Sequence, residues 1–440
     1  MDIYEQITKM ADEIAPELVA QRRDFHKFAE KGWFEMRTSS IIARKLTEMG
    51  YEVLVGDQVC KKDARMGVPS DEELEEQYER AVAQGADPEF VKYTKGGMTG
   101  VIGILRCGEG PTVAMRFDID ALGVFEEKDK SHRPACEGFG SVNEGFMHAC
   151  GHDGHATIGL GVAKVLMSIK DSLHGTMKLI FQPAEEHMGA GELVDCNFTQ
   201  VAKPDAFIGL HVSPEIDAGS IGLKKGPANA SNDFFNIKIK GKGGHGAHPE
   251  NCIDPVVISG YVITQLQTVI SRENYPVYPG VLTIGSIHGG TVNNIIPDYV
   301  EMHGTLRSLD PDCRKKMMAA IDRVVKGCAK SMRGTAEIEW EIGVPPLVND
   351  DSIIEAVAEA AAKTIGADHV SYVKNPSMGS EDFSVLFPKF GPGAQFRLGS
   401  GNNEDPNSRH GLHNSKNVFD EKCIRTGASV IIQYARDFLR

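Results

Sequence analysis

The stretch MKLIFQPAEE (177–186) decides the fold class of this chain. Its first six residues are mostly apolar, and they are followed by a proline and two adjacent carboxylates. An apolar run of this length that ends at a turn residue is typical of a buried strand. Two more such runs occur, at 112–117 and 206–211, and a helical pattern covers about 155–169. Strands that alternate with helices predict an α/β sheet.

Polar residues follow each of these three strands directly. They are Asp118 and Asp120 after the first strand, Glu185 and Glu186 after the second, and His211 at the end of the third. Ligands of open α/β sheets bind beyond the carboxyl ends of the strands. We therefore expect three separate segments to bring metal-binding side chains to one edge of the sheet.

Residues 233–342 form a pattern of their own. The predicted order is strand 234–240, helix 254–272, strand 281–287, strand 299–305, helix 311–332 and strand 336–342. This βαββαβ order is the ferredoxin-like arrangement. We expect an α/β/α catalytic domain with a mixed sheet, made of residues 1–222 and 343–440, that is interrupted by an inserted α+β domain at 223–342.

Residues 57–96 stand apart by composition. They include the Glu-rich helical segment DEELEEQYERAVAQGA (71–86), and proline and glycine flank it. Charge runs of this kind are usually solvated. We interpret the segment as an insertion on the surface of the fold, in the form of a solvated helix without catalytic residues.

Composition excludes several classes of protein. The 440 residues suggest two domains, and 47 Lys and Arg against 61 Asp and Glu give a net charge of −14, which argues against nucleic acid as a partner. No apolar run reaches the length of a membrane span, and the charged N-terminus has no signal-peptide pattern. Nine scattered cysteines suit reduced thiols, so we expect a cytoplasmic protein.

The segment HACGHDGH (148–155) is the densest group of metal-binding residue types. In an extended chain Cys150 and His152 would face the same side and could reach one ion together. Thiolate and imidazole suit zinc, although manganese, cobalt or nickel could also be held. The sequence has no HExxH motif and no CxxC pair, so the zincin and zinc-ribbon interpretations fail.

Seven segments, in order along the chain, resemble the M20 family of peptidases and amidohydrolases. They are RFDIDAL (116–122), MHACGHDGH (147–155), LIFQPAEE (179–186), GLHV (209–212), GKGGHGAHPE (241–250), GGTVNNIIP (289–297) and GTLR (304–307). The resemblance is to the amidohydrolase branch, in which Cys replaces the usual bridging Asp. The insertion at 57–96 and SHRP (131–134) resemble the p-aminobenzoyl-glutamate hydrolase A-subunit group.

The resemblance implies a site for two divalent metal ions, zinc or manganese before cobalt or nickel. The implied ligands are Cys150, His152, Glu186, His211 and His413. Cys150 would bridge the two ions, and Asp120 would orient a metal-binding histidine. Spacing alone does not separate His413 from His410, three residues earlier.

The resemblance also implies catalytic roles. Glu185 would be the general base that activates water for attack on the amide carbon. His245 in GGHGAH would stabilise the oxyanion from a partner subunit, so a homodimer through the inserted domain is expected. The nearby His248 is better interpreted as a surface histidine.

Three further residues match positions that handle the substrate. Arg307 and Asn294 would hold a free carboxylate, for which the planar guanidinium of arginine is suited. Gly379 would line the pocket, although its presence in a turn has a backbone explanation as well.

These features predict a hydrolase of N-acyl or N-aroyl amino acids with a free carboxylate, and p-aminobenzoyl-glutamate is a candidate substrate. One alternative is a dipeptidase or another deacylase of N-acyl amino acids. An alternative of another class is a non-catalytic metal-binding subunit in a hetero-oligomer with a B-type subunit. The presence of both Glu185 and His245 argues against this non-catalytic role.

Overall fold

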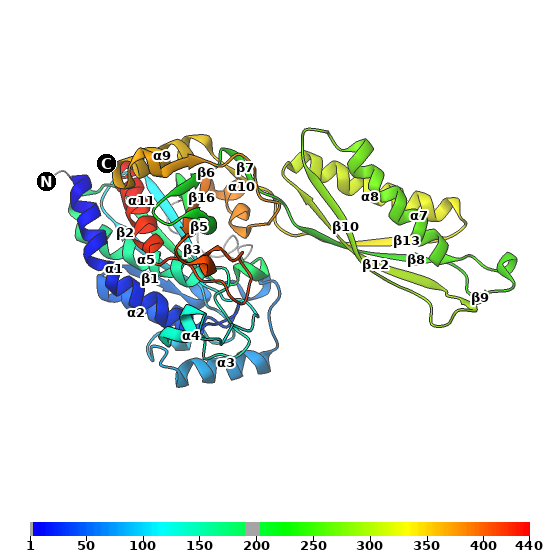
Figure 1. The fold of residues 1–440 in the computed structure, drawn as a ribbon, viewed down its shortest axis with the longest axis horizontal. Coiled ribbons are helices and arrows are strands. Elements are labelled where there is room, and N and C mark those ends of the chain that lie inside the picture. Colours follow the sequence, from blue (N-terminus) through cyan, green and yellow to red (C-terminus); the bar gives the residue numbers. More distant parts are fainter. Residues whose placement is uncertain (1–2, 190–202) are drawn as a thin grey trace. The chain divides into compact units, whose positions relative to one another are not determined.

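The structure is a computed structural model, which describes residues 3–189 and 203–440. The chain divides into two compact units (Figure 1). Unit 1 consists of residues 1–226, 349–374 and 385–440, and unit 2 consists of residues 227–348 and 375–384. Each unit is described by itself below.

Unit 1 is built on a mixed sheet, which confirms the predicted α/β class. Within the described residues the sheet has eight strands in the order β1-β2-β4-β3-β5-β16-β6-β15. The strands are β1 (Glu52–Val55), β2 (Val101–Arg106), β3 (Thr112–Asp118), β4 (Thr176–Gln182), β5 (Ala206–Asp217), β6 (Ile221–Leu223), β15 (Val370–Tyr372) and β16 (Gly393–Gly401). Strand β3 is parallel to both β4 and β5, so these three strands end at the same edge.

The helices of unit 1 pack on one another and on the sheet. They are α1 (Ile3–Lys27), α2 (Met36–Met49), α3 (Asp71–Ala83), α4 (Arg133–Glu137), α5 (His152–Ser168), α9 (Asp351–Ile365), α10 (Phe387–Phe390) and α11 (Lys422–Phe438). Helix α5 contacts α1, α2 and α11 as well as β3 (Figure 1). A side chain at Gly159 would lie 2.7 Å from the rings of Phe117 and Phe181, so this glycine lets α5 approach the sheet closely.

Unit 2 contains an antiparallel sheet covered on one face by two helices. Along the chain its main elements are β8 (Asp233–Lys240), α7 (Pro255–Thr268), β10 (Gly280–His288), β12 (Tyr299–Ser308), α8 (Pro311–Ser331) and β13 (Thr335–Glu341). In the described part of the unit these strands form a four-stranded sheet in the order β10-β12-β8-β13. Helices α7 and α8 contact each other and the sheet (Figure 1).

Short elements complete unit 2 and its junction with unit 1. They are β7 (Gly226–Asn229), β9 (Gly244–His245), a π-helical turn (Val269–Glu273), β11 (Ile295–Ile296) and β14 (Leu347–Asn349). Both long helices begin at an Asp-Pro pair. The side chain of Asp254 accepts the amide of Val256 at 2.9 Å, and that of Asp310 accepts the amide of Cys313 at 2.8 Å. These caps explain why the helices begin where they do.

Residues 57–96 contain the predicted helix, but they make more buried contacts than the sequence indicates. Only 71–83 form an α-helix, and Leu74 and Ala81 on this helix are buried in a cluster with Trp33. The indole N–H of Trp33 donates to the carbonyl of Met66 at 2.7 Å. The charged residues of α3 are solvated as expected, but the segment packs on unit 1 through one apolar stripe.

The structure can be compared with the expectations of reduced cysteines and of no membrane span. Among residues 3–189 and 203–440, every cysteine is a free thiol. No helix in that part of the chain combines the length and the apolar character that crossing a bilayer requires.

A buried ion pair joins α1 to α5. The Nε atom of Arg22 lies 2.8 Å from Oδ2 of Asp153, and these side chains are 1% and 0% exposed. Arg22 also lies 3.4 Å from Glu421, next to the start of α11, and its guanidinium lies over the ring of Phe419. Three segments far apart in the sequence are therefore held by one guanidinium.

Replacing Arg22 by methionine keeps most of the side-chain volume but removes the arginine cation from Asp153, whose Oδ2 atom then keeps, among the described residues, only its contact with Nδ1 of His26 at 2.8 Å. We expect Arg22→Met to lower the free energy of unfolding by about 3–5 kcal/mol, as breaking one side of a buried pair usually does. Urea denaturation followed by Trp33 fluorescence in a Trp340→Phe background measures this loss in unit 1.

Arg106→Met is the matched control, because Arg106 pairs with Glu52 on the surface with both side chains about half exposed. Arg106→Met should lower the free energy of unfolding by less than about 1 kcal/mol. Equal losses of unfolding free energy in the two variants would contradict the prediction that burial makes the Arg22–Asp153 pair more important for stability.

Candidate metal centre

Cys150 and His152 lie at the N-terminal end of α5, and both are buried. The expectation that they share one side of an extended chain is wrong. His152 is the first residue of the helix, and Gly151 before it has a left-handed backbone with φ of 84°. A sharp turn at a glycine, rather than a pleated strand, directs both side chains to the same place.

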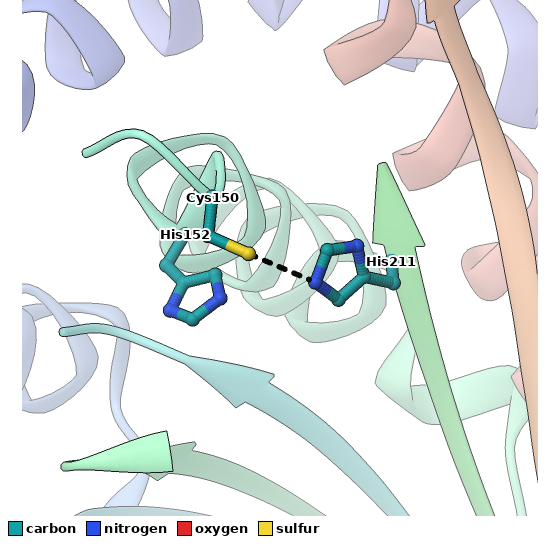
Figure 2. Close-up of side chains that lie close together, drawn as sticks. All are labelled: Cys150, His152 and His211. Atoms are coloured by element: carbon teal, nitrogen blue, oxygen red, sulfur yellow. Dashed lines mark hydrogen bonds between the residues drawn. The ribbon is translucent and has the colours of Figure 1, made fainter. Parts of the chain in front are cut away.

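His211 meets these two residues from the middle of β5, because the strand continues past the predicted end at residue 211 to Asp217. Its Nε2 atom lies 3.4 Å from Sγ of Cys150 (Figure 2). Ligand atoms of Cys150, His152 and His211 all lie within 4.8 Å of one another. The ring of His211 donates from Nδ1 to the carbonyl of Val212 at 2.8 Å, so Nε2 is left facing the thiol.

Cys150 also belongs to a second group of three, with Glu186 and His413. The Nε2 atom of His413 lies 3.2 Å from Oε1 of Glu186. The backbone amide of His413 donates to the carbonyl of Ala149 at 2.9 Å, which joins the C-terminal loop to the Cys150 segment. His413, and not His410, is therefore the histidine that the structure brings to Glu186.

Glu185 and Glu186 lie in a tight turn just after β4. Residues 185–187 form one 3₁₀ turn, and Ala184 and Met188 on its two sides have φ of 51° and 61°. Left-handed backbone is strained for residues other than glycine, and such strain clusters at functional sites. Ligand atoms of His152, Glu185 and Glu186 lie within 4.8 Å of one another.

Asp120 links the histidine and the glutamate turn. One of its oxygens accepts from Nδ1 of His152 at 3.1 Å, and the other accepts the backbone amide of Glu186 at 3.0 Å. The carboxylate fixes the tautomer of His152 and directs its Nε2 atom toward the group. The Nε2 atom is buried and has no hydrogen-bond partner.

Asp118 lies beside the same histidine as Asp120, with its Oδ2 atom 3.7 Å from Nε2 of His152. Its oxygens contact Nη1 of Arg116 at 2.6 Å and Nδ1 of His155 at 2.5 Å. His155 in turn accepts the amide of Val212 through Nε2 at 3.0 Å. Although His155 belongs to the Cys-His segment, both of its ring nitrogens are already used, so it supports β5.

Carboxylates dominate the electrostatics of the group. Burial alone lowers the pKa of His152, but the charges of Asp118 and Asp120 outweigh burial and raise it to about 10. Burial raises the pKa of the Cys150 thiol well above its usual range, and the charges of Glu186 and Glu185 raise it further. A bound divalent cation would offset these negative charges and favour the thiolate.

The residues therefore fit a divalent metal site. Both His152 and His211 donate from Nδ1 to an oxygen and keep Nε2 for the group, which is the usual arrangement of metal-binding histidines. The unpartnered Nε2 of His152 is the buried polar atom that an ion would satisfy. Thiolate, imidazole and carboxylate together suit zinc and similar transition metals.

The other predicted site residues belong to unit 2. His245 and Asn294 lie side by side, because β9 pairs with β11 and the amide of Gly246 donates to the carbonyl of Asn294 at 2.9 Å. Both are exposed within this unit. The Nη1 atom of Arg307 donates to the carbonyl of Met378 at 3.0 Å, and Gly379 follows in the same loop.

One buried acid beside this centre was not predicted from the sequence. Glu35 is fully buried and accepts the amide of Ala184 at 2.8 Å. It stands in the segment GWFEMRTSS (32–40), where no spacing of polar residues singles it out. Its position is visible only once the fold brings residue 35 to residue 184.

Comparison with known proteins identifies the chain at the level of family. The sequence pattern of peptidase family M20/M25/M40 matches residues 114–437. The chain belongs to this family. The resemblance drawn from its motifs is thus confirmed, and the chain is an M20-type metal-dependent hydrolase, whose relatives act on amide and peptide bonds.

Relatives match over almost the whole chain. Thermostable carboxypeptidase 1 of Saccharolobus solfataricus is 33% identical over 433 residues, which cover 97% of both proteins. The A-type subunit of the p-aminobenzoyl-glutamate hydrolase of Escherichia coli K12 is 30% identical over 442 residues, which cover 99% of this chain and 98% of that protein. The crystal structure of the YXEP protein of Bacillus subtilis, a dinuclear metal-binding M20 peptidase, matches with a TM-score of 0.76 and 29% identity, over 97% of this chain and 99% of that one.

Metal content tests the two groups directly. Because Cys150 belongs to both, we expect about two ions per chain in the protein saturated with Zn²⁺ or Mn²⁺, and Cys150→Ala should lower both occupancies. Plasma mass spectrometry after dialysis measures the ions. Cys328→Ala, at another buried cysteine, is the matched control and should keep both. A wild-type protein without bound metal would refute the dinuclear site.

Proposed function

We propose that this M20 hydrolase uses two metal ions to cleave the amide bond of N-acyl or N-aroyl amino acids that carry a free carboxylate. One observation carries the proposal. The thiol of Cys150 is shared by two groups of candidate ligands, one with His152 and His211 and the other with Glu186 and His413. A shared ligand between two such groups is what a bridged pair of ions requires.

In this proposal the five residues of the two groups are the metal ligands, and zinc or manganese is the expected metal, with cobalt or nickel as further possibilities. Bound ions would supply Lewis acidity to the carbonyl oxygen and to the attacking water. Asp120 keeps His152 in the tautomer that presents Nε2 and holds the turn that carries Glu186. A single carboxylate thus supports ligands of both groups.

Glu185 is the proposed general base. Its carboxylate is buried, and it lies within 4.8 Å of ligand atoms of His152 and Glu186. A carboxylate beside the ions can take the proton of the attacking water and later give it to the leaving nitrogen. His245 is proposed to donate a hydrogen bond to the oxygen that becomes negative.

The carboxylate of the substrate is assigned to unit 2. We propose that Arg307 and Asn294 bind it and that Gly379 lines the pocket. Arg307 suits the role because its guanidinium offers two parallel donors to a carboxylate. The full-length similarity to one chain of a p-aminobenzoyl-glutamate hydrolase supports p-aminobenzoyl-glutamate as the first substrate to test.

Two alternative functions are also tested below. A dipeptidase, or a deacylase of other N-acyl amino acids, would use the same centre with a different pocket, and the similarity to a carboxypeptidase supports testing peptides. A non-catalytic subunit that works beside a B-type partner is the alternative of another class, and it is motivated by the Escherichia coli relative, which is named as one subunit of its enzyme.

One experiment tests the function and the base together. The chain loaded with Mn²⁺ or Zn²⁺ is assayed against dipeptides and N-acyl amino acids, including p-aminobenzoyl-glutamate, and turnover of a carboxylate-bearing amide is expected. Glu185→Gln should keep both ions and lower kcat by about 10²–10⁴-fold, because a general base contributes about that much.

Glu144→Gln is the matched control, since Glu144 is exposed and pairs with Lys128 on the surface. It should keep full activity. If Glu185→Gln retains its metal and turns over substrate at the wild-type rate, another residue must be the general base. Turnover of none of the amides by the metal-loaded wild type would favour the non-catalytic role.

We further infer that unit 2 is a ferredoxin-like domain through which two copies associate. The strand order β10-β12-β8-β13 with helices α7 and α8 on one face supports this assignment. Strand β10 is an edge strand of this sheet, and open edges favour pairing with another chain. Exposed apolar residues lie on β10 and α7, namely Val281 and Ile287, and Val256, Val257 and Tyr261.

A homodimer would let His245 act in the site of the partner subunit. His245→Ala and Glu185→Gln are each expected to be nearly inactive alone. After subunit exchange, a mixed dimer would contain one site with both defects and one site with neither. Each mixed dimer should therefore have about half of the activity of a wild-type dimer. Native mass spectrometry shows whether exchange has occurred. Exchange without recovery of activity would contradict action across the dimer.

A further inference from the structure

The turn that carries Glu185 is held in an unfavourable backbone conformation. Ala184 and Met188 flank it with φ of 51° and 61°, and neither is glycine. Residues other than glycine adopt this region only when surrounding contacts hold them there. The contacts that hold the turn therefore decide where the carboxylate of Glu185 points.

The backbone amides of the turn have identifiable partners. The amides of His187 and Gly189 donate to the carbonyl of Ala184 at 3.1 and 2.8 Å, which closes the turn on itself. The amide of Glu186 donates to Asp120 at 3.0 Å. The amide of Ala184 donates to Oε1 of Glu35 at 2.8 Å. The amides on both sides of Glu185 thus donate to side-chain carboxyl groups from distant segments.

Glu35 is held in place at its other oxygen as well. The hydroxyl of Thr99 donates to Oε2 at 2.7 Å, and the carbonyl of Thr99 accepts the hydroxyl of Ser39 at 2.5 Å. The side chain of Glu35 is fully buried. With both carboxyl oxygens bonded and the residue enclosed, the acceptor for the Ala184 amide has little freedom to move.

A local structural role does not explain the acid. Glu35 occupies the N-cap position of α2, but its side chain makes no capping hydrogen bond there. Burial raises its pKa well above the usual range, and the nearby charge of Asp120 raises it further, so the site is costly for a carboxyl group. With one oxygen bonded to the Ala184 amide and the other to Thr99, this costly buried acid ties the turn of Glu185 to the Thr99 segment.

We infer that Glu35 is a positioning residue for hydrolysis: its carboxyl group holds the Ala184 amide, and with it the left-handed turn that aims Glu185 and Glu186. This inference rests on the proposed roles of Glu185 as base and Glu186 as ligand. Small displacements of a reacting group cost large factors in rate, so an anchor one residue from the base affects kcat more than substrate binding.

Three variants distinguish the hydrogen bond from Glu35 to the turn from the packing of the Glu35 side chain. Glu35→Met keeps the length of the side chain but removes the acceptor, and it should lower kcat by about 10–100-fold with KM changed less than about threefold. Glu35→Gln keeps an acceptor for the Ala184 amide and should retain activity within about threefold of the wild type. Thr99→Val removes the bond to the other carboxyl oxygen but keeps the acceptor for the Ala184 amide, so it should lower kcat by a smaller factor than Glu35→Met does.

Hydrogen exchange gives a measurement that does not depend on turnover. In Glu35→Met the amides of residues 181–189 should exchange faster, while α5 and unit 2 exchange as in the wild type. Glu35→Gln should restore protection. This result would stand even if the wild type hydrolysed none of the amides tested, so failure of the proposed function would be seen separately.

Two outcomes would overturn the inference. One is wild-type kcat and wild-type protection of residues 181–189 in Glu35→Met. The other is faster exchange throughout unit 1 in that variant, which would assign Glu35 to general stability. If Glu35→Met does not fold, Glu35→Gln still tests the inference. This variant keeps an acceptor for the Ala184 amide, so a loss of activity in it would contradict the anchoring role of Glu35.

Discussion

The parallel register of β3 with β4 and β5 is the constraint on which the centre depends. Asp118 at the end of β3 pairs with Gln182 at the end of β4, and Arg116 pairs with Gly209 two residues before His211. Segments separated by up to about ninety residues therefore leave the sheet at one edge, as parallel strands require. Helix α5 adds Cys150 and His152 because it packs closely against the same strands.

This geometry concentrates charge. Burial opposes ionisation of the carboxyl groups, yet Arg116 and the neighbouring histidines hold the pKa of Asp118 well below its usual range. The pKa of Glu186 is likewise lowered against burial, mainly by its hydrogen bond to His413. Asp118 and Glu186 thus stay ionised at neutral pH, where they attract cations.

The sequence predicts most of the elements but not how they bring the side chains together. Strands and long helices were correct because apolar periodicity and Asp-Pro helix starts are strong local signals. The convergence of Asp120 and Glu185 followed from strand ends, whereas β5 continues past His211 to Asp217. The extended backbone assumed at Cys150 was wrong, since the left-handed conformation of Gly151 leaves no trace in periodicity, and the same holds for the left-handed Ala184 before Glu185. Glu35 could not be predicted, because its partner lies 149 residues away.

The order of strands in unit 1 has a consequence for synthesis of the chain. Strand β16 lies between β5 and β6, so the middle of the sheet closes only after residues 393–401 have left the ribosome. Unit 2 lies almost wholly earlier in the chain, and since domains fold as units it can form first. His413 and α11 follow later still. Until residues 393–413 have been made, a nascent chain therefore carries an exposed strand edge and lacks His413, one of the proposed ligands.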